Sequence, residues 1–427
     1  MKIPDAEIVE ILRVGQEGDG IAALADGTPL FVPFGLPGER AMVKPSVKRG
    51  DGFAAHIDHI ERSSLERVPA ACQHFGICGG CSLQQWQMES YAAWKTGLLD
   101  MALRRAGFMP KLDPIVITPP GTRRRMDLAI RRTQAGIVLG LHTARDKNVI
   151  DLAECPVLHP ELMALVPKLR DVLRRLQALG HEGSAIVNLL DSGPDILLRT
   201  DKKLAVSDRT ILAAFAEANR VPRVSWAQNT AQPETAALLR PPITSLAGTP
   251  VAVPPGGFMQ ATADGEAAIV AAVMAGLPPK PVAKARVLEL FAGSGTLTFA
   301  IVKHMRVHAV EGDAAAHASL KAAANTTGQT GRITTEQRDL ARQPLSAKEV
   351  SAFDTVLLDP PHGGASTQIA QIAASTIKRV IYVSCNPTAL GRDALMLKQA
   401  GFKLVSAVPV DQFLWSARLE SVSVFVK

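Results

Sequence analysis

The stretch Val287–Thr298, which reads VLELFAGSGTLT, decides the fold of the C-terminal part of the chain. Its opening residues, Val287–Leu290, have the mostly apolar character of a strand. Gly293 and Gly295 then interrupt this pattern, and from Thr298 onward apolar residues return with helical spacing. A strand, a glycine turn and a helix start let the backbone approach a ligand closely, and a helix N-terminus favours polar or anionic groups. The stretch therefore predicts a ligand-binding turn at the end of a strand.

Two classes of ligand fit such a turn. A dinucleotide site would carry G-x-G-x-x-G, but the third glycine of that pattern is missing after Gly295. The form E-L-F-A-G-S-G-T resembles the S-adenosylmethionine loop of class I methyltransferases. The next predicted strand, Arg306–Val310, is followed by Glu311, and a carboxylate in this position commonly binds a ribose diol. A nicotinamide or flavin site, or a turn that binds no nucleotide, stays open on these residues alone.

Polar residues follow several more predicted strands in the same part of the chain. From residue 285 the pattern predicts the order βαβαβαβ, hence a parallel sheet with its ligands at the carboxyl ends of the strands. Five successive strand ends carry polar or turn residues, namely Phe291–Thr296, Glu311, Asp339, Asp359 and Cys385. Their convergence on one crevice predicts a single site.

Cys385, in the stretch YVSCNP, suggests the chemistry of that site. Carbon 5 of a pyrimidine is too weak a nucleophile to take a methyl group unaided. A thiolate that adds at C6 creates an enolate whose C5 can take it, and a base must then remove the C5 proton. Methylation of an exocyclic amine would be favoured by an aromatic residue after D-P-P, but His362 follows Asp359-Pro360-Pro361 here. A buried cysteine without a chemical role is the structural alternative.

The other four cysteines of the chain precede residue 156. Cys72, Cys78 and Cys81 form a C-x5-C-G-G-C pattern, and Cys155 follows at a distance. An odd total of five argues against a disulfide framework. Four thiolates suit a [4Fe–4S] cluster or tetrahedral zinc, and unmetallated core cysteines are the third possibility.

The N-terminal residues 6–60 read as short strands separated by turns such as GQEGDG. Such spacing predicts a small barrel of the kind that binds oligonucleotides, or a β-domain that only packs against its neighbours. The sequence GQEGDGIA followed by Leu36-Pro37-Gly38-Glu39 resembles the TRAM domain, a small RNA-binding barrel attached to RNA-modifying enzymes.

Composition sets the remaining bounds. The chain has 427 residues, of which 47% are hydrophobic, so we expect two to four globular domains rather than disorder. A formal net charge of +7 fits a polyanionic partner or an ordinary basic protein. No apolar run approaches the roughly 18 residues that a membrane span needs, and the N-terminus has no signal-peptide core. We therefore expect a cytoplasmic protein that binds no membrane.

Taken together, these motifs resemble the bacterial RNA uracil-C5 methyltransferases over nearly the whole chain. The resemblance rests on the cysteine pattern, F-x-Q at Phe258–Gln260, ELFAGSGT, V-E-G at Val310–Gly312, D-P-P followed soon by glycine, YVSCNPTALGRD and the late LES. The four cysteines make the chain similar to the iron–sulfur 23S rRNA branch rather than to the tRNA branch.

The resemblance implies a role for each matching residue. Cys385 matches the nucleophile and Glu420 the base that removes the C5 proton. Cys72, Cys78, Cys81 and Cys155 match the ligands of a [4Fe–4S] cluster. Positions that contact S-adenosylmethionine or the uracil are matched by Gln260, Phe291, Thr296, Glu311, Asp339 and Asp359, next to Gly293 and Gly295. The implied partner is RNA, most simply 23S rRNA, bound by a monomer that needs no protein partner.

The resemblance also implies an α/β chain with three parts. Residues 1–62 would form the OB-like TRAM barrel. Residues 63–87 and 122–257 would form a central α+β RNA-binding domain with the cluster. Residues 88–121 and 258–427 would form the class I, Rossmann-like methyltransferase domain.

Three departures from the family pattern weigh on this interpretation. Thr296 stands where the family often has asparagine, His362 replaces the usual arginine, and residues 411–418 lack the family's P-H-T-x-H. The enzymatic alternatives are a tRNA uracil-C5 methyltransferase and an RNA cytosine-C5 methyltransferase. The latter usually has a cysteine in the aspartate-proline segment, and Leu358–His362 has none. The non-enzymatic alternative is a catalytically impaired RNA-binding or ribosome-assembly factor.

Overall fold

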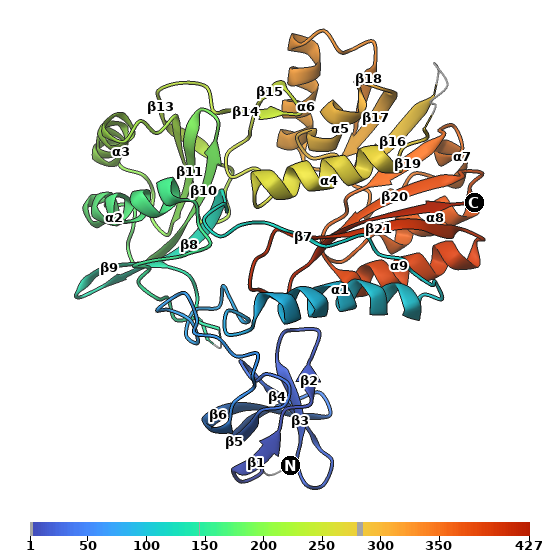
Figure 1. Ribbon diagram of the computed structural model, residues 1–427. Helices are drawn as coiled ribbons and strands as arrows, with labels where there is room; N and C mark the ends of the chain where they lie inside the picture. Colours follow the sequence, from blue (N-terminus) through green and yellow to red (C-terminus); the bar gives the residue numbers. More distant parts are fainter. Residues whose placement is uncertain (1–2, 145, 280–284) are drawn as a thin grey trace. The chain divides into compact units, whose positions relative to one another are not determined.

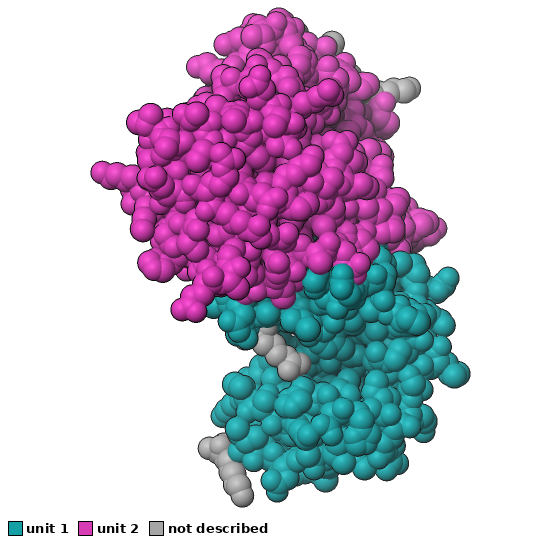
Figure 2. Space-filling model, turned by 90° about the vertical axis from the view of Figure 1, so that its left-hand side faces the viewer, with its two compact units in different colours: residues 1–98, 142–148, 413–418 teal, residues 99–141, 149–412, 419–427 magenta. Residues whose placement is uncertain are grey.

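The computed structural model describes residues 3–144, 146–279 and 285–427, which form two compact units (Figure 2). Unit 1 consists of Met1–Leu98, His142–Asn148 and Phe413–Arg418. Unit 2 consists of Leu99–Leu141, Val149–Gln412 and Leu419–Lys427. Within the described ranges, no helix combines the length and the apolar character needed to cross a bilayer.

Unit 1 contains a six-stranded sheet with the spatial order β1-β5-β6-β4-β3-β2. Its strands are β1 (Glu7–Glu10), β2 (Arg13–Val14), β3 (Gly20–Ala23), β4 (Pro29–Val32), β5 (Arg40–Arg49) and β6 (Gly52–Arg62). Inward-facing residues of these strands, among them Leu30, Val43 and Phe53, form an apolar core. Short strands separated by turns were expected here.

One carboxylate of unit 1 is buried and paired. Glu39 accepts hydrogen bonds from the Arg67 guanidinium at 2.6 and 2.8 Å and from the Leu36 N–H at 2.9 Å. Burial alone would raise the pKa of Glu39, and the bonds from Arg67 and the backbone instead hold it below its usual value. The pair therefore ties Arg67 to the turn that precedes β5.

The helix α1 (Met88–Arg105) begins in unit 1, and its residues from Leu99 onward belong to unit 2. Tyr91, Leu99 and Leu103 are fully buried along it, as the helical spacing of apolar residues predicts. Arg104 and Arg105 lie in its last turn, where cations suit the helix dipole.

Unit 2 contains two sheets and a short hairpin. The first sheet has the order β13-β12-β11-β10-β8-β9. It consists of β8 (Arg125–Thr133), β9 (Gly136–Gly140), β10 (Glu182–Leu190), β11 (Gly193–Thr200), β12 (Arg223–Gln228) and β13 (Glu234–Leu238). It shares an apolar core with α2 (Pro160–Arg175) and α3 (Val206–Ala218). The hairpin pairs β14 (Ile243–Leu246) with β15 (Thr249–Ala252).

The second sheet has eight strands in the order β18-β17-β16-β19-β20-β22-β21-β7. They are β7 (Val116–Ile117), β16 (Arg286–Leu290), β17 (Arg306–Glu311), β18 (Ile333–Gln337), β19 (Thr355–Leu358), β20 (Arg379–Ser384), β21 (Lys403–Asp411) and β22 (Glu420–Val426). The first five strands of this order are mutually parallel, and β22 runs antiparallel to both β20 and β21. The parallel sheet predicted from residue 285 is therefore confirmed.

Helices flank this sheet in the alternating order that the sequence predicted. They are α4 (Ala263–Gly276), α5 (Thr296–Ile301), α6 (Ala314–Thr326), α7 (Ala347–Val350), α8 (Ser366–Ala374) and α9 (Pro387–Gln399). Both α4 and α9 contact β20 and β22, and they lie on opposite sides of these strands (Figure 1). The chain order reverses at β16, which lies between β17 and β19. In open α/β sheets, ligands bind at the carboxyl ends of the strands next to such a switch point.

Candidate functional site

The turn after β16 has the backbone geometry of a ligand-binding loop. Phe291, Gly293 and Gly295 all have positive φ, at 63°, 56° and 102°. A Cβ added to Gly295 would lie 2.6 Å from the ring of Phe299, so this position requires glycine. A positive φ at the non-glycine Phe291 is a strained conformation that is often found at functional sites. Thr296 is the first residue of α5, directly after this turn.

Glu311 closes the turn from the end of β17. Its Oε2 accepts the Gly293 N–H at 2.7 Å and its Oε1 accepts the Asp313 N–H at 2.6 Å. The structure thus brings together the glycine turn and the acidic residue that the sequence placed at two neighbouring strand ends. Asp339 follows β18, is exposed, and accepts the Ala341 N–H at 3.0 Å.

A further acidic residue, Glu289, lies on the strand that leads into this turn. Glu289, on β16, is buried and accepts a hydrogen bond from the Thr298 hydroxyl at 2.6 Å. Burial raises the pKa of Glu289 to about 8, and the charges of Asp359 and Glu311 add to the effect. Sequence reasoning treated this residue only as part of the strand.

Cys385 lies at the end of β20, between the strand and the N-cap of α9. Its side chain is half-buried, and its Sγ lies 3.8 Å from Nδ1 of His362. His362 belongs to the loop after β19 that carries the Asp359-Pro360-Pro361 motif. A nucleophile at a strand end beside a helix N-terminus is the arrangement that favours a thiolate.

Glu420 is the first residue of β22 and is buried in a polar network. Gln412 Nε2 donates to Glu420 Oε2 at 3.0 Å and to Gln260 Oε1 at 2.6 Å, and Gln412 Oε1 accepts the Ala261 N–H at 2.9 Å. Gln260 Nε2 lies 3.5 Å from Asp359 Oδ2. The second oxygen of Glu420, Oε1, is buried without a hydrogen-bond partner among the described residues.

This network holds two carboxyl groups whose pKa values are raised. Burial, followed by the charge of Asp359, raises the pKa of Glu420 to about 8, although the hydrogen bond from Gln412 opposes this effect. Burial raises the pKa of Asp359 to about 7. A carboxylate with a pKa near the working pH can accept a proton from carbon and release it again. Gln260, Asp359 and Glu420, predicted from three distant parts of the sequence, therefore lie in one network.

Gln412 is the residue of this network that sequence reasoning missed. It lies one residue beyond β21 and reaches Glu420 because β21 and β22 are antiparallel neighbours. A buried glutamine between two strands has no periodic or motif signal. The sequence indicated only that residues 411–418 differ from the P-H-T-x-H that the family resemblance led us to expect, and not which residue contacts Glu420 instead.

The segment Phe413–Arg418, between Gln412 and Glu420, belongs to unit 1 and is held there through its backbone. The buried Lys95 Nζ donates to the Phe413 carbonyl at 3.4 Å and also to the Arg418 carbonyl. The Tyr91 hydroxyl accepts the Trp415 N–H at 2.8 Å. The positive φ of Trp415, 60°, marks a tight turn in this segment.

The four cysteines predicted to bind a cluster are divided between the units. Cys72, Cys78 and Cys81 lie in unit 1, Cys155 lies in unit 2, and all four are half-buried. The Gly80 N–H donates to Cys78 Sγ at 3.4 Å, a contact that suits a thiolate ligand. In the part of the chain that the structure describes, no three His, Cys, Asp or Glu side chains are arranged to hold a metal ion. Four thiols are the donor set that a [4Fe–4S] cluster requires, so the chemistry of these residues fits that group.

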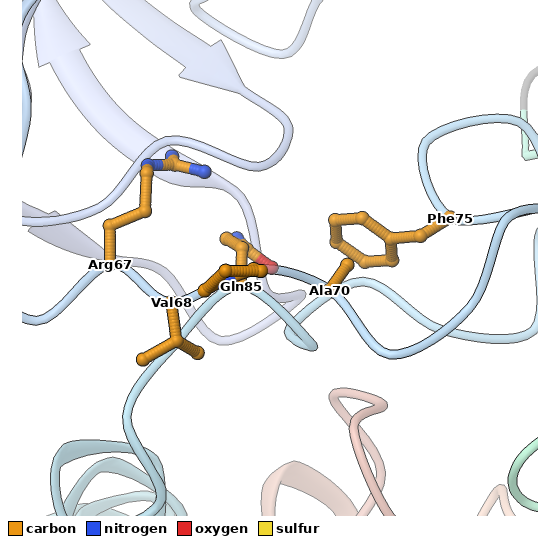
Figure 3. A pocket seen from close by; sticks show the side chains of 6 residues that line it. Arg67, Val68, Ala70, Phe75 and Gln85 are labelled. Atoms are coloured by element: carbon orange, nitrogen blue, oxygen red, sulfur yellow. The ribbon is translucent and has the colours of Figure 1, made fainter.

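Unit 1 also contains a pocket of about 440 Å³ that the sequence did not indicate. It is lined by Arg67, Val68, Pro69, Ala70, Phe75 and Gln85 (Figure 3). The Phe75 ring packs edge-on against Phe34, with 5.0 Å between ring centroids. Arg67 and Gln85 both donate to the Phe34 carbonyl, at 2.6 and 3.2 Å. These two polar side chains therefore use hydrogen bonds to hold the backbone next to the pocket.

The strand order of the second sheet, its glycine turn after β16 and the acidic residue after β17 define a Rossmann-like methyltransferase fold. A solved tRNA (uracil-54, C5)-methyltransferase of Pyrococcus abyssi, in complex with S-adenosyl-L-homocysteine, shares this fold. It aligns with a TM-score of 0.71 and 20% sequence identity over 99% of this chain and 100% of that chain. A family model described as Conserved hypothetical protein 95 matches residues 269–387.

Sequence relatives identify the family. The chain is 38% identical over 420 residues to an uncharacterized RNA methyltransferase of Brucella suis biovar 1, covering 98% of this chain and 97% of the relative. It is 33% identical over 418 residues to the 23S rRNA (uracil(1939)-C(5))-methyltransferase RlmD of Yersinia enterocolitica, covering 96% of this chain and 93% of that relative. The chain belongs to this family of RNA methyltransferases, so the predicted family and the prediction of an enzyme are confirmed.

Proposed function

We propose that this protein transfers a methyl group from S-adenosylmethionine to C5 of a uridine in 23S rRNA. The observation that carries the proposal is the pairing of β20 with β22. Ser384 lies opposite Ser421 in this antiparallel pair. Cys385 directly follows Ser384 and Glu420 directly precedes Ser421, so both residues lie at the same end of the two strands. The proposed nucleophile and a buried carboxyl group with a raised pKa thus lie at the same end of neighbouring strands, in the sheet that also carries the glycine turn. The similarity to RlmD supports uracil C5 as the target and 23S rRNA as the substrate.

S-adenosylmethionine supplies the methyl group when it is bound. Glu311 would accept the ribose hydroxyls, and Phe291, Gly293, Gly295 and Thr296 would line the cofactor with backbone and ring. Asp339 would lie towards the adenine side of the crevice, and Asp359 with Gln260 would face the reacting groups. Binding of S-adenosyl-L-homocysteine to the Pyrococcus protein of the same fold supports this choice of cofactor.

The chain's own residues then perform three tasks. The Cys385 thiolate attacks C6 of the uracil, and the electron pair displaced toward C5 forms the new bond to the methyl carbon. The bond from that carbon to the sulfonium sulfur would break with its electron pair on sulfur, and S-adenosylhomocysteine would leave. Glu420 takes the proton from C5, and the electrons of that C–H bond restore the C5–C6 double bond as the C6–S bond breaks. The thiolate is regenerated, and the proton on Glu420 passes to solvent. Flipping the target base out of an RNA loop costs a few kcal/mol, less than unstacking it from a helix.

The remaining parts of the chain complete the proposal. Residues 1–62 would act as an OB-like TRAM barrel, and residues 63–87 with 122–257 as a central domain that holds RNA. Residues 88–121 and 258–427 would carry the chemistry. Cys72, Cys78, Cys81 and Cys155 would bind a structural [4Fe–4S] cluster, supported by their donor chemistry and spacing. We infer a cytoplasmic monomer that needs no protein partner.

The test is transfer of labelled methyl groups to total RNA that lacks this modification, followed by size fractionation and digestion to nucleosides. We expect the label in 5-methyluridine from 23S rRNA, and none with the Cys385→Ala variant, which should still bind S-adenosylmethionine. The same nucleoside from tRNA would overturn the choice of RNA. Label in 5-methylcytosine would overturn the choice of base. No label, with the cofactor bound, would favour a non-catalytic RNA-binding factor.

A further inference from the structure

The loop after β19 brings an imidazole to the thiol of Cys385. His362 Nδ1 and Cys385 Sγ are 3.8 Å apart, which is within hydrogen-bonding distance for a sulfur atom. His362 is exposed and Cys385 is half-buried, so solvent reaches the imidazole of this pair.

Asn386 determines which nitrogen of the imidazole carries the proton. Its Oδ1 accepts the N–H groups of Thr388 and Ala389 at 3.0 and 3.4 Å, which fixes the orientation of the side-chain amide. The amide nitrogen Nδ2 therefore faces the histidine, donates to the His362 carbonyl at 2.9 Å and lies 3.4 Å from Nε2. An N–H that points at Nε2 favours the tautomer with a lone pair on Nε2 and a hydrogen on Nδ1. Nδ1–H then points at the sulfur.

The helix α9 acts on the same sulfur atom. Cys385 directly precedes Asn386, the N-cap of this 13-residue helix. The partial positive charge of a helix N-terminus stabilises a thiolate. Two groups with partial positive charge, the N-terminus of α9 and the Nδ1–H of His362, therefore lie next to the Cys385 sulfur.

The loop that carries His362 is fixed from several sides. Arg392 of α9 donates to the Gly363 carbonyl at 2.7 Å. Asp393 accepts the Ala365 N–H at 2.8 Å and the Tyr382 hydroxyl at 2.8 Å. A Cβ at Gly364, where φ is 81°, would lie 2.7 Å from both Arg392 and Asp393.

Each element next to the Cys385–His362 pair carries charged or titratable groups. They are Asp359 in the loop itself, Arg392 and Asp393 on α9, Tyr382 on β20 and Glu420 on β22. Asp393 already accepts hydrogen bonds from Tyr382, Arg392, the Ser366 hydroxyl and the Ala365 N–H. Asp359 and Glu420 are carboxyl groups and supply no positive charge, whereas His362 Nδ1 is a nitrogen within hydrogen-bonding distance of the Cys385 sulfur.

We propose that His362 is a catalytic residue that stabilises the Cys385 thiolate through an Nδ1–H···S⁻ hydrogen bond; the proposal rests on the function proposed above. The thiol proton passes to solvent, and the electron pair of the S–H bond stays on sulfur. That pair forms the S–C6 bond with the uracil and returns to sulfur when the base is released. The Nδ1–H of His362 stabilises the negative charge on the Cys385 sulfur before attack and after release of the base, and His362 transfers no proton itself.

Alkylation of Cys385 with iodoacetamide as a function of pH tests this contact directly. It is measured on the full chain, without RNA or cofactor, by mass spectrometry of the peptide that contains Cys385. A free thiol ionises near pH ~8.5. We expect half-maximal alkylation of the wild type at least about one pH unit below that of His362→Ala, which corresponds to a tenfold difference in thiolate population.

A conservative variant separates the hydrogen bond from a general effect of the loop. In His362→Asn the amide nitrogen stands near the place of Nδ1, so it should restore part of the shift, whereas His362→Gln, with a longer side chain, should restore less. Identical alkylation profiles for the wild type and His362→Ala would overturn the proposal. Because alkylation needs no RNA, a shift that is present in a chain that does not methylate uridine would leave this contact standing and reject only the proposed function.

Discussion

At the scale of single residues, the two side chains that we propose to react each contact a neighbour whose role no motif indicated. Cys385 is contacted by His362, and Glu420 is contacted by Gln412. Burial makes the ionised form of Glu420 costly, and the Gln412 N–H reduces that cost. The resulting pKa of about 8 is close to the working pH, which suits a group proposed to take up and release a proton.

Replacement of Glu420 by glutamine should separate the two halves of the reaction. Cys385 can still attack C6 and C5 can still receive the methyl group, but no base removes the C5 proton. We expect a protein–RNA adduct that survives denaturing electrophoresis, and a turnover rate lower by roughly 10²–10⁴-fold. Cys385→Ala is the matched control and should give no adduct. Rapid turnover without an adduct in Glu420→Gln would show that another group is the base.

Replacement of Gln412 by methionine should shift the pH dependence of turnover. The wild-type rate should rise about tenfold per pH unit up to about pH 8, because only deprotonated Glu420 can accept the proton. Gln412→Met removes the hydrogen bond that lowers the pKa of Glu420, so this limb should move upward by about 1–2 pH units.

Gln412→Glu is the control for the Ala261 contact. It keeps an acceptor for the Ala261 N–H but removes the donor to Glu420, so it should also move the limb upward. A pH profile that stays unchanged in both variants would mean that Gln412 serves only to pack β21 against β22.

The residues of the site differ in how far the sequence predicted them. Cys385, Glu311 and the two turn glycines follow strands whose periodicity is readable, so their positions could be inferred from local pattern. Glu420 was placed by family resemblance alone. Gln412 and the contact of His362 could not be inferred, because each depends on which strands and loops are neighbours in space.

At the scale of elements, the strand β16 and the helix α5 carry a polar interaction inside an apolar layer. Glu289 of β16 bonds to Thr298 of α5 between residues such as Val287, Leu297 and Phe299, which are buried. The sequence predicted this strand, the helix after it and the parallel order of the sheet, although the helix begins at Thr296 and not at Thr298. It did not predict that β22 inserts antiparallel between β20 and β21, because this pairing joins residues near 380 to residues near 425 without a local signal.

The buried Glu289 should make folding stability fall as the pH rises. Its pKa is about 8 in the folded chain and 4.5 by reference, so between these values the folded state binds more protons than the unfolded state. Stability from this group is present below about pH 4.5 and is lost as the pH rises toward 8, by up to about 1.4 kcal/mol per pH unit. Asp359 and Glu420 should act in the same direction.

Calorimetric melting between pH 5 and 8 measures this effect. Glu289→Gln cannot ionise, so its melting temperature should fall less steeply with pH than that of the wild type. An additional cost that does not depend on pH is expected, since the new amide hydrogens would be buried. Glu217→Gln, at an exposed position of α3, is the matched control and should leave the slope as it is. Equal slopes for wild type and Glu289→Gln would show that the carboxyl group ionises freely in the folded chain.

At the scale of the whole molecule, chemistry and RNA binding must be combined in one chain with a formal charge of +7. The sequence divided the chain into three parts by motif, whereas the packing of the structure separates two compact units. The difference arises because motif boundaries follow function along the chain. Compact units follow contacts, so the short segments 142–148 and 413–418 join residues 1–98.

The proposed cluster would take its ligands from two separate stretches of the chain, which contribute Cys72, Cys78 and Cys81, and Cys155. We expect protein purified without oxygen to contain about four irons per chain and to show broad visible absorption. Cys78→Ser should lose both and melt at a lower temperature, since bound metal stabilises the folded state. Cys385→Ser is the matched control and should keep the iron, because we propose that this cysteine serves the reaction and not the cluster. Removal of iron by a chelator should destabilise the wild type but leave Cys78→Ser unaffected.

A colourless wild type that contains zinc would contradict the iron–sulfur assignment and keep a metal site. If wild type and Cys78→Ser contain no metal and are equally stable, these four thiols only pack in the protein and bind no cluster.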